Sequence, residues 1–131
     1  MSTHARDALG RPVAPRSPYA VPPVPEQALS AEAALDLAQE LLDAGRAFAA
    51  HEVLEAVWKA SPPDERDRWQ GLVQLCVGVT HAQRGNTTGA VRLLRRGAAR
   101  LDGHLAAWAN AEAERLESGD LDVPRLRLRG S

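Results

Sequence analysis

Residues 71–80 read Gly-Leu-Val-Gln-Leu-Cys-Val-Gly-Val-Thr and form the most apolar stretch of the chain. Gln74 is the one strongly polar side chain among them, and apolar groups surround the rest of a helical wheel. A helix that is apolar on every side is normally buried among other helices. The helical pattern extends over residues 62–84 and stops at Gly85. We therefore predict a central helix that neighbouring helices cover.

Amphipathic stretches on both sides of residues 62–84 supply those neighbours. Helical spacing of apolar residues predicts helices over about 31–44, 46–60, 87–101 and 104–117. Their expected boundaries are Ser30 as N-cap, Gly45 as a stop, Ser61 as N-cap with Pro62 and a variant capping box to Asp64, and Asn86 as N-cap. The fold class predicted is all-α, a compact bundle of about five helices.

A faint internal repeat relates two parts of this bundle. Gly45, Ala50 and Leu54 recur forty residues later as Gly85, Ala90 and Leu94. Each set marks a glycine turn followed by a helix with a small residue at a close contact, in the style of tetratricopeptide hairpins. We expect two stacked helical hairpins, although two unrelated hairpins would produce the same pattern.

The termini differ from the helical part in composition. Residues 1–28 are expected to be a disordered N-terminal segment because they show no period and are rich in proline: Pro12, Pro15, Pro18, Pro22, Pro23 and Pro25. Residues 29–118 are the predicted helical-bundle domain. Residues 119–131 are expected to be an irregular tail that carries Arg125, Arg127 and Arg129.

Bulk composition narrows the class of protein. The chain has 131 residues, a net charge of −1 and 44% hydrophobic residues, which is one domain of ordinary globular composition. Its single cysteine, Cys76, forms no intrachain disulfide and is expected to be a core residue. No apolar run is long enough to span a bilayer. We predict a cytoplasmic protein without a membrane partner.

One group of polar residues lies where apolar residues are expected. His51 and Glu55 are four residues apart, so they share one face of the second helix, with Trp58 beside them. Gln74 and His81 fall in a narrow stripe of the third helix. Because a short turn joins the two helices, we expect these stripes to face each other. Two interpretations stay open: a self-satisfied hydrogen-bond network, or a site open to a ligand.

A divalent metal, Zn, Mn or Fe, is one candidate ligand for this cluster. His51, Glu55 and His81 would then be three ligands, with water as the fourth, as in a metal-dependent hydrolase. The zinc-peptidase pattern His-Glu-x-x-His is absent, because Glu55 replaces the second histidine and Glu52 is expected to face away. No Ser or Cys lies in a sequence context typical of a nucleophile, and the sequence has no glycine-rich phosphate loop. His4 and His104 are expected to be solvent-exposed, and the sequence identifies no reaction.

Charge suggests a different class of function. Residues 31–60 carry six acidic side chains, whereas residues 84–101 carry five arginines and no acid. Opposite faces of this kind suit a homo-oligomer or a protein partner. Arg92, Arg96 and Arg100 form a stripe that suits phosphate, but no aromatic residues interleave with it, so a nucleic-acid partner is disfavoured.

Three blocks of the sequence resemble a known family. They are Phe48-Ala-Ala-His51-Glu52-Val-Leu-Glu55-Ala-Val-Trp58, Arg68-Trp69-Gln70-Gly71-Leu72-Val73-Gln74-Leu75 and Arg84-Gly85-Asn86-Thr-Thr-Gly89-Ala90. Together they resemble the bacterial and archaeal domain-of-unknown-function family 309, over roughly residues 31–101.

The resemblance implies a small helical bundle and, for some members, a predicted metal-dependent hydrolase. By this resemblance the family-motif positions are Phe48, His51, Glu52, Glu55, Trp58, Gly71, Gln74, Gly85, Asn86 and Ala90. We interpret the chain as a binding or scaffold module, with the hydrolase and the arginine-stripe interaction as alternatives.

Overall fold

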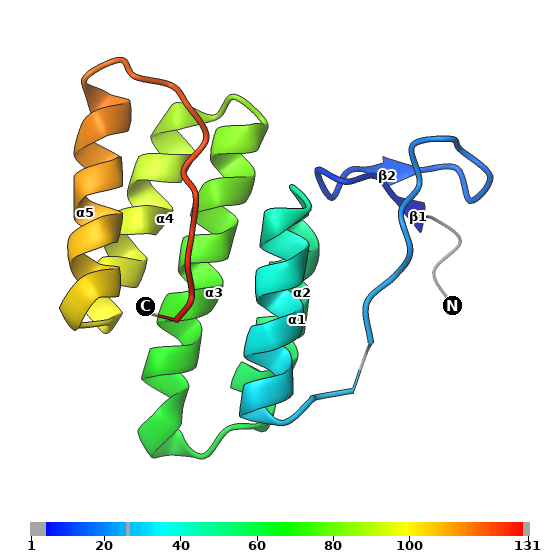
Figure 1. Cartoon of the computed structure of the whole chain (residues 1–131), viewed down its shortest axis with the longest axis horizontal. Helices are drawn as coiled ribbons and strands as arrows, with labels where there is room; N and C mark the ends of the chain where they lie inside the picture. The colour runs from blue at the N-terminus through cyan, green and yellow to red at the C-terminus, as the bar shows by residue number, and fades with distance from the viewer. Residues whose placement is uncertain (1–4, 26, 130–131) are drawn as a thin grey trace.

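The structure, a computed structural model, describes residues 5–25 and 27–129. Five helices, α1 to α5, run side by side and alternate in direction, and each packs on the next along the chain (Figure 1). Their bounds are α1 Ala31–Asp43, α2 Ala47–Ala60, α3 Pro63–Gln83, α4 Thr87–Arg100 and α5 Gly103–Glu117. The predicted all-α bundle of about five helices is confirmed.

Two of the predicted helix caps are present and one is wrong. The Ser30 hydroxyl accepts a hydrogen bond from Ala33 N, and Asn86 Oδ1 accepts one from Gly89 N, so both residues are N-caps. Ser61 instead ends α2, and its hydroxyl donates to Val57 O at 2.6 Å. Helix α3 has no side-chain N-cap and begins at Pro63, whose missing N–H needs no partner there.

The internal repeat corresponds to two hairpins with the same turn. After α1, Gly45 has φ +76° and Arg46 N donates to Leu41 O at 2.7 Å. After α3, Gly85 has φ +79° and Asn86 N donates to His81 O at 2.8 Å. Positive φ favours glycine, and these hydrogen bonds satisfy carbonyls at the helix end. The α1–α2 and α3–α4 hairpins stack into one bundle, and α5 packs on α4.

Helix α3 is the centre of the bundle, as its apolar sequence predicts. Its buried residues include Leu72, Leu75 and Cys76, all with at most 1% of their surface exposed. Glycines bring α3 and α4 close: a Cβ on Gly97 would lie 2.9 Å from the carbonyl oxygen of Gly71. This close approach explains glycine inside α4, where it costs helix propensity.

Residues 5–25, called here the N-terminal arm, carry local structure despite their prolines. Strands β1 (Ala5–Arg6) and β2 (Pro12–Val13) pair antiparallel, with Ala5 opposite Val13. Gly10, at φ +82°, packs so closely on Phe48 that an added Cβ would lie 2.1 Å from the ring. The Arg84 guanidinium donates to Leu9 O at 2.7 and 3.0 Å. The sequence pattern did not indicate this docking on α2 and α3.

Residues 124–129, called here the C-terminal segment, form no helix or strand but are not loosely placed. They run along α3 (Figure 1) and are bound by Gln39 of α1. Pro124, Leu126 and Leu128 are buried, whereas Arg125, Arg127 and Arg129 are exposed. The segment therefore extends the hydrophobic core, which the compositional division at residue 119 did not indicate.

Two further sequence-based expectations concern placement. None of the helices in the described part of the chain combines the length and apolarity needed to cross a membrane. His104 is exposed near the start of α5, and His4 lies outside the described residues.

Candidate functional site

His51 and Glu55 form a pair on α2, as their spacing predicts. His51 Nδ1 lies 2.7 Å from Phe48 O, and because a carbonyl only accepts, Nδ1 carries the proton and donates. His51 Nε2 lies 3.5 Å from Glu55 Oε2, and the other oxygen of Glu55 is 3.2 Å from Lys59 Nζ. The exposed fractions of the His51 and Glu55 side chains are 15% and 37%, so the pair is open to solvent on one side.

The predicted cluster does not close into a self-satisfied network among the described residues. Gln74 Oε1 is buried and accepts no hydrogen bond there. Trp58 is half-buried and interacts with Arg66, whose guanidinium carbon lies 5.0 Å from the ring centroid. An unpaired buried amide oxygen costs about 1–3 kcal/mol. Within residues 5–25 and 27–129, Gln74 Oε1 is therefore a buried acceptor without a donor.

His81 is held by the start of α4. Its Nδ1 lies 3.1 Å from Asn86 Nδ2, while Asn86 Oδ1 accepts from Gly89 N, so the amide NH₂ donates to His81. This contact fixes the neutral ring with its proton on Nε2. Burial, and then the charges of Arg84 and Arg92, lower the pKa of His81 below its ordinary value. The ring is consequently neutral at physiological pH.

The three residues predicted as metal ligands are not assembled. His51 and Glu55 are adjacent, but within the part of the chain that the structure describes no three His, Cys, Asp or Glu side chains are placed to hold one metal ion. His81 lies instead against Asn86 and Gly89. Among the described residues these three side chains therefore do not form a metal centre, and metal binding by His51, Glu55 and His81 stays a prediction.

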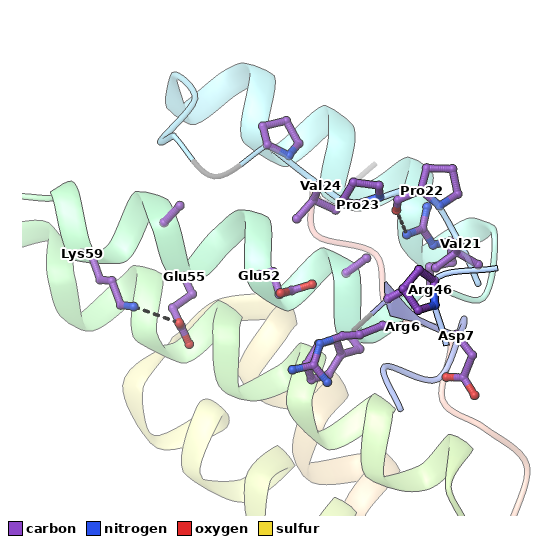
Figure 2. Close-up of a pocket in the computed structure, with 16 residues that line it drawn as sticks. Arg6, Asp7, Val21, Pro22, Pro23, Val24, Arg46, Glu52, Glu55 and Lys59 are labelled. Carbon is purple, nitrogen blue, oxygen red and sulfur yellow. Dashed lines mark hydrogen bonds and ion pairs between the residues drawn. The ribbon is translucent and has the colours of Figure 1, made fainter. Parts of the chain in front are cut away.

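A cleft of about 580 Å³ lies between the N-terminal arm and α2. Figure 2 shows Val21, Pro22, Pro23 and Val24 of the arm on one side and Glu52, Glu55 and Lys59 of α2 on the other. Arg46 fixes the arm here, since its Nη2 donates to Pro22 O at 2.6 Å. Glu52 therefore lines a cleft. The sequence predicts only that it faces away from the polar cluster.

Most charged groups of the cleft already have partners. Glu55 pairs with Lys59, and Asp7 accepts from Leu9 N at 3.0 Å and from Arg11 N at 2.8 Å. Arg6 donates to Gly10 O at 2.7 Å and lies over the Phe48 ring at 4.8 Å. Glu52, half-buried, has no hydrogen bond or ion pair among the described residues. It is thus the carboxylate that a ligand in this cleft would meet.

Cys76 takes no part in the site. It is fully buried, and burial raises the pKa of its thiol to about 12. A thiol in this state is neither a metal ligand nor a nucleophile at neutral pH. This agrees with its expected place in the core.

The arginine stripe of α4 is partly occupied by ion pairs. Arg100 of the stripe pairs with Asp67 of α3, and Arg95, beside the stripe, pairs with Glu117 of α5. Arg92 and Arg96 are exposed. An interaction with protein or nucleic acid through Arg92, Arg96 and Arg100 stays a prediction.

Sequence comparison finds a known family and one relative that match part of the chain. The family model described as "Domain of unknown function (DUF309)" matches residues 35–93. The uncharacterized protein YpuF of Bacillus subtilis (strain 168) is 50% identical over 48 residues, which are 36% of this chain and 28% of YpuF. This chain thus matches less than a third of that relative, and no solved structure matches. The family model thus matches the part of the chain that includes His51, Glu55, Gln74 and His81, and the resemblance seen in the sequence is confirmed over residues 35–93.

Proposed function

We propose that this protein is a ligand-binding module whose site is the cleft between the N-terminal arm and α2. The supporting observation is the half-buried carboxylate of Glu52, which lines the cleft without a partner among the described residues. A half-buried carboxylate that lines a cleft without an ion-pair partner favours a ligand that brings a positive charge.

The lining of the cleft defines the chemistry of the ligand. The arm contributes apolar side chains, Val21 and Val24 and the prolines beside them, and α2 contributes the unpaired carboxylate of Glu52. The cationic side chains of the lining are bound in place, because Arg6 and Arg46 donate to backbone carbonyls and Lys59 pairs with Glu55. A ligand that joins a cationic amine to an apolar body could pair its amine with Glu52 and pack its apolar body on the arm. The His51–Glu55 pair, next along α2, adds acceptor atoms beside this position.

A matched pair of probes tests this proposal. Phenethylamine and hydrocinnamate have similar apolar bodies and opposite charges, and amide chemical-shift changes in the full chain report where each one binds. We expect phenethylamine to shift the amides of Glu52, Glu55 and Ala56 with a Kd on the order of millimolar, and hydrocinnamate to leave them unchanged.

Charge-matched variants separate specific binding from general attraction. Glu52→Gln should weaken phenethylamine binding at least about tenfold, or about 1.4 kcal/mol. Glu65→Gln removes the same charge from an exposed residue in the first turn of α3, outside the cleft, and should have no effect. Equal binding of the two probes, or equal effects of the two variants, would contradict the proposal.

A metal-binding function has one specific observation in its favour. The Nδ1–H of His51 donates to a backbone carbonyl, which orients the ring as in many metal-ligating histidines and leaves Nε2 facing Glu55. Elemental analysis of protein purified without chelator or affinity-tag metal tests this alternative. Stoichiometric Zn, Mn or Fe that is lost in His51→Ala would support it, and an unchanged melting curve with chelator would count against it.

A further inference from the structure

Gln39 of α1 holds the C-terminal segment by its backbone. Gln39 Nε2 donates to Leu126 O at 3.1 Å, and Gln39 Oε1 accepts from Leu128 N at 2.9 Å. The side-chain amide thus supplies one donor and one acceptor to residues two apart, as the edge of a β-sheet would. An extended segment needs such partners because it has none of its own.

The segment also matches α1 in shape and charge. Leu126 and Leu128 are 4% and 5% exposed and belong to the core cluster, so alternate side chains enter the bundle. On the outward side, Arg129 binds the Asp36 carboxylate at 2.7 Å and donates to Glu32 O at 3.2 Å. Together these contacts recognise an extended Leu-x-Leu-Arg sequence, residues 126–129.

The residues that connect this segment to α5 have exposed apolar side chains, unlike the segment itself. Within residues 118–123, Leu121 is 62% exposed and Val123 is 41% exposed, so the connection packs poorly while the segment that follows it packs well. Gly119 has φ +101°, and its turn satisfies the end of α5. The contacts with α1 thus lie in the docked segment, whereas the connection is bound to α5 by Arg115, which donates to Asp120 O and Asp122 O.

We propose that the α1 surface formed by Glu32, Asp36 and Gln39 is a peptide-docking site, and that its partner in trans is the C-terminal segment of a second copy of this chain. The acidic surface and the arginine-bearing segment are complementary within one chain, so two chains offer the same pair of surfaces to each other. Docking within one chain is favoured at low concentration because a short tether gives an effective concentration in the millimolar range. Two copies exchange their C-terminal segments when the connection is too short for a segment to reach α1 of its own chain.

Shortening the tether tests the exchange directly. The six residues 118–123 can span about 20 Å, whereas two residues span about 7 Å. Neighbouring helix axes lie about 8–10 Å apart, and both α4 and α3 lie between α5 and α1, so two residues cannot reach. We expect deletion of residues 119–122 to convert a monomer at micromolar concentration into a dimer, measured by size exclusion with light scattering.

The matched variant adds Gln39→Ala to the deletion and should return the protein to a monomer. A folded deletion variant that stays monomeric, with the Leu128 amide unprotected from hydrogen exchange, would overturn the proposal. So would a dimer that persists unchanged with Gln39→Ala.

A second measurement does not depend on the deletion. In the full chain, Leu126→Asp with Leu128→Asp should release the segment, and a labelled peptide with the sequence of residues 122–129 should then bind in trans. Binding should weaken at least tenfold with Gln39→Ala, and similarly when the arginines of the peptide are glutamates. No binding, or equal binding of the two peptides, would rule out the segment of a second copy as the occupant.

Discussion

Replacing Gly10 by alanine should detach the N-terminal arm while leaving the bundle folded. An alanine there would place its Cβ 2.1 Å from the Phe48 ring, and residue 10 has φ +82°. The left-handed backbone costs about 1–2 kcal/mol for alanine, and the overlap costs about 1–3 kcal/mol more. The total, about 2–5 kcal/mol, is comparable to what a short segment gains from docking once its ordering entropy is subtracted.

Hydrogen exchange of the arm amides measures this effect. The Val21 amide donates to Arg6 O at 2.9 Å and the Gly10 amide to Asp7 O at 3.0 Å, so both should be protected in the native chain. A loss of 2 kcal/mol or more lowers their protection about 30-fold or more. The free energy of unfolding of the bundle, from urea denaturation, should change by less than about 1 kcal/mol. Phenethylamine binding should also weaken, since the arm forms one wall of the cleft.

Gly45→Ala is the control for backbone strain alone. Gly45 has φ +76°, but an added Cβ would have no atom within 4 Å. We expect it to lower the stability of the bundle by about 1–2 kcal/mol and to leave the arm protected. If Gly10→Ala kept the arm protected and instead lowered the stability of the whole chain, the arm would be part of one cooperative unit and the reasoning would be refuted.

Three more predictions follow from the interior. Gly97→Ala should lower the free energy of unfolding by about 1–3 kcal/mol despite better helix propensity, because the new Cβ would meet the backbone oxygen of Gly71 at 2.9 Å; urea denaturation measures it. The pKa of His81 is lowered by folding, so the unfolded state binds more protons below its ordinary pKa of about 6.5. Stability should therefore fall as the pH drops through that value, and His81→Gln should flatten this part of the pH profile of the melting temperature. Cys76, whose pKa burial raises to about 12, should resist iodoacetamide at pH 8 in the folded chain and react in urea.

The sequence was informative where structure is decided locally. The Ser30 and Asn86 caps, and the turns at Gly45 and Gly85, depend on residues within one helical turn, and all four are present as predicted. The prediction of Ser61 as an N-cap was wrong because either Pro62 or Pro63 can occupy the first position of a helix. The later one, Pro63, begins α3, and the serine bonds backward to α2.

Tertiary contacts explain where the sequence was less informative about the site. A helical wheel placed His81 with Gln74 in one stripe of half-buried residues, but the ring contacts the start of α4, which the wheel of α3 does not represent. The docking of the arm depends on Arg84 and Leu9, which are 75 residues apart. The alternation of leucine and arginine over residues 124–129 was a readable signal, since period two is typical of an extended segment with one buried face.

Both non-helical segments are bound to the bundle in the same way, and this connects the two proposals. Extended backbone outside a sheet has no ladder partner for its N–H and C=O groups. Here side chains of the bundle take that role. Arg84 and Arg46, which flank α3 and α2, donate to carbonyls of the arm, and Gln39 of α1 binds the C-terminal segment through both its donor and its acceptor. Truncating these three side chains should therefore release the segments, because their backbone groups would lose these partners. A bundle whose helices hold extended chain on two separate faces has the recognition chemistry of a binding module already in use within its own chain.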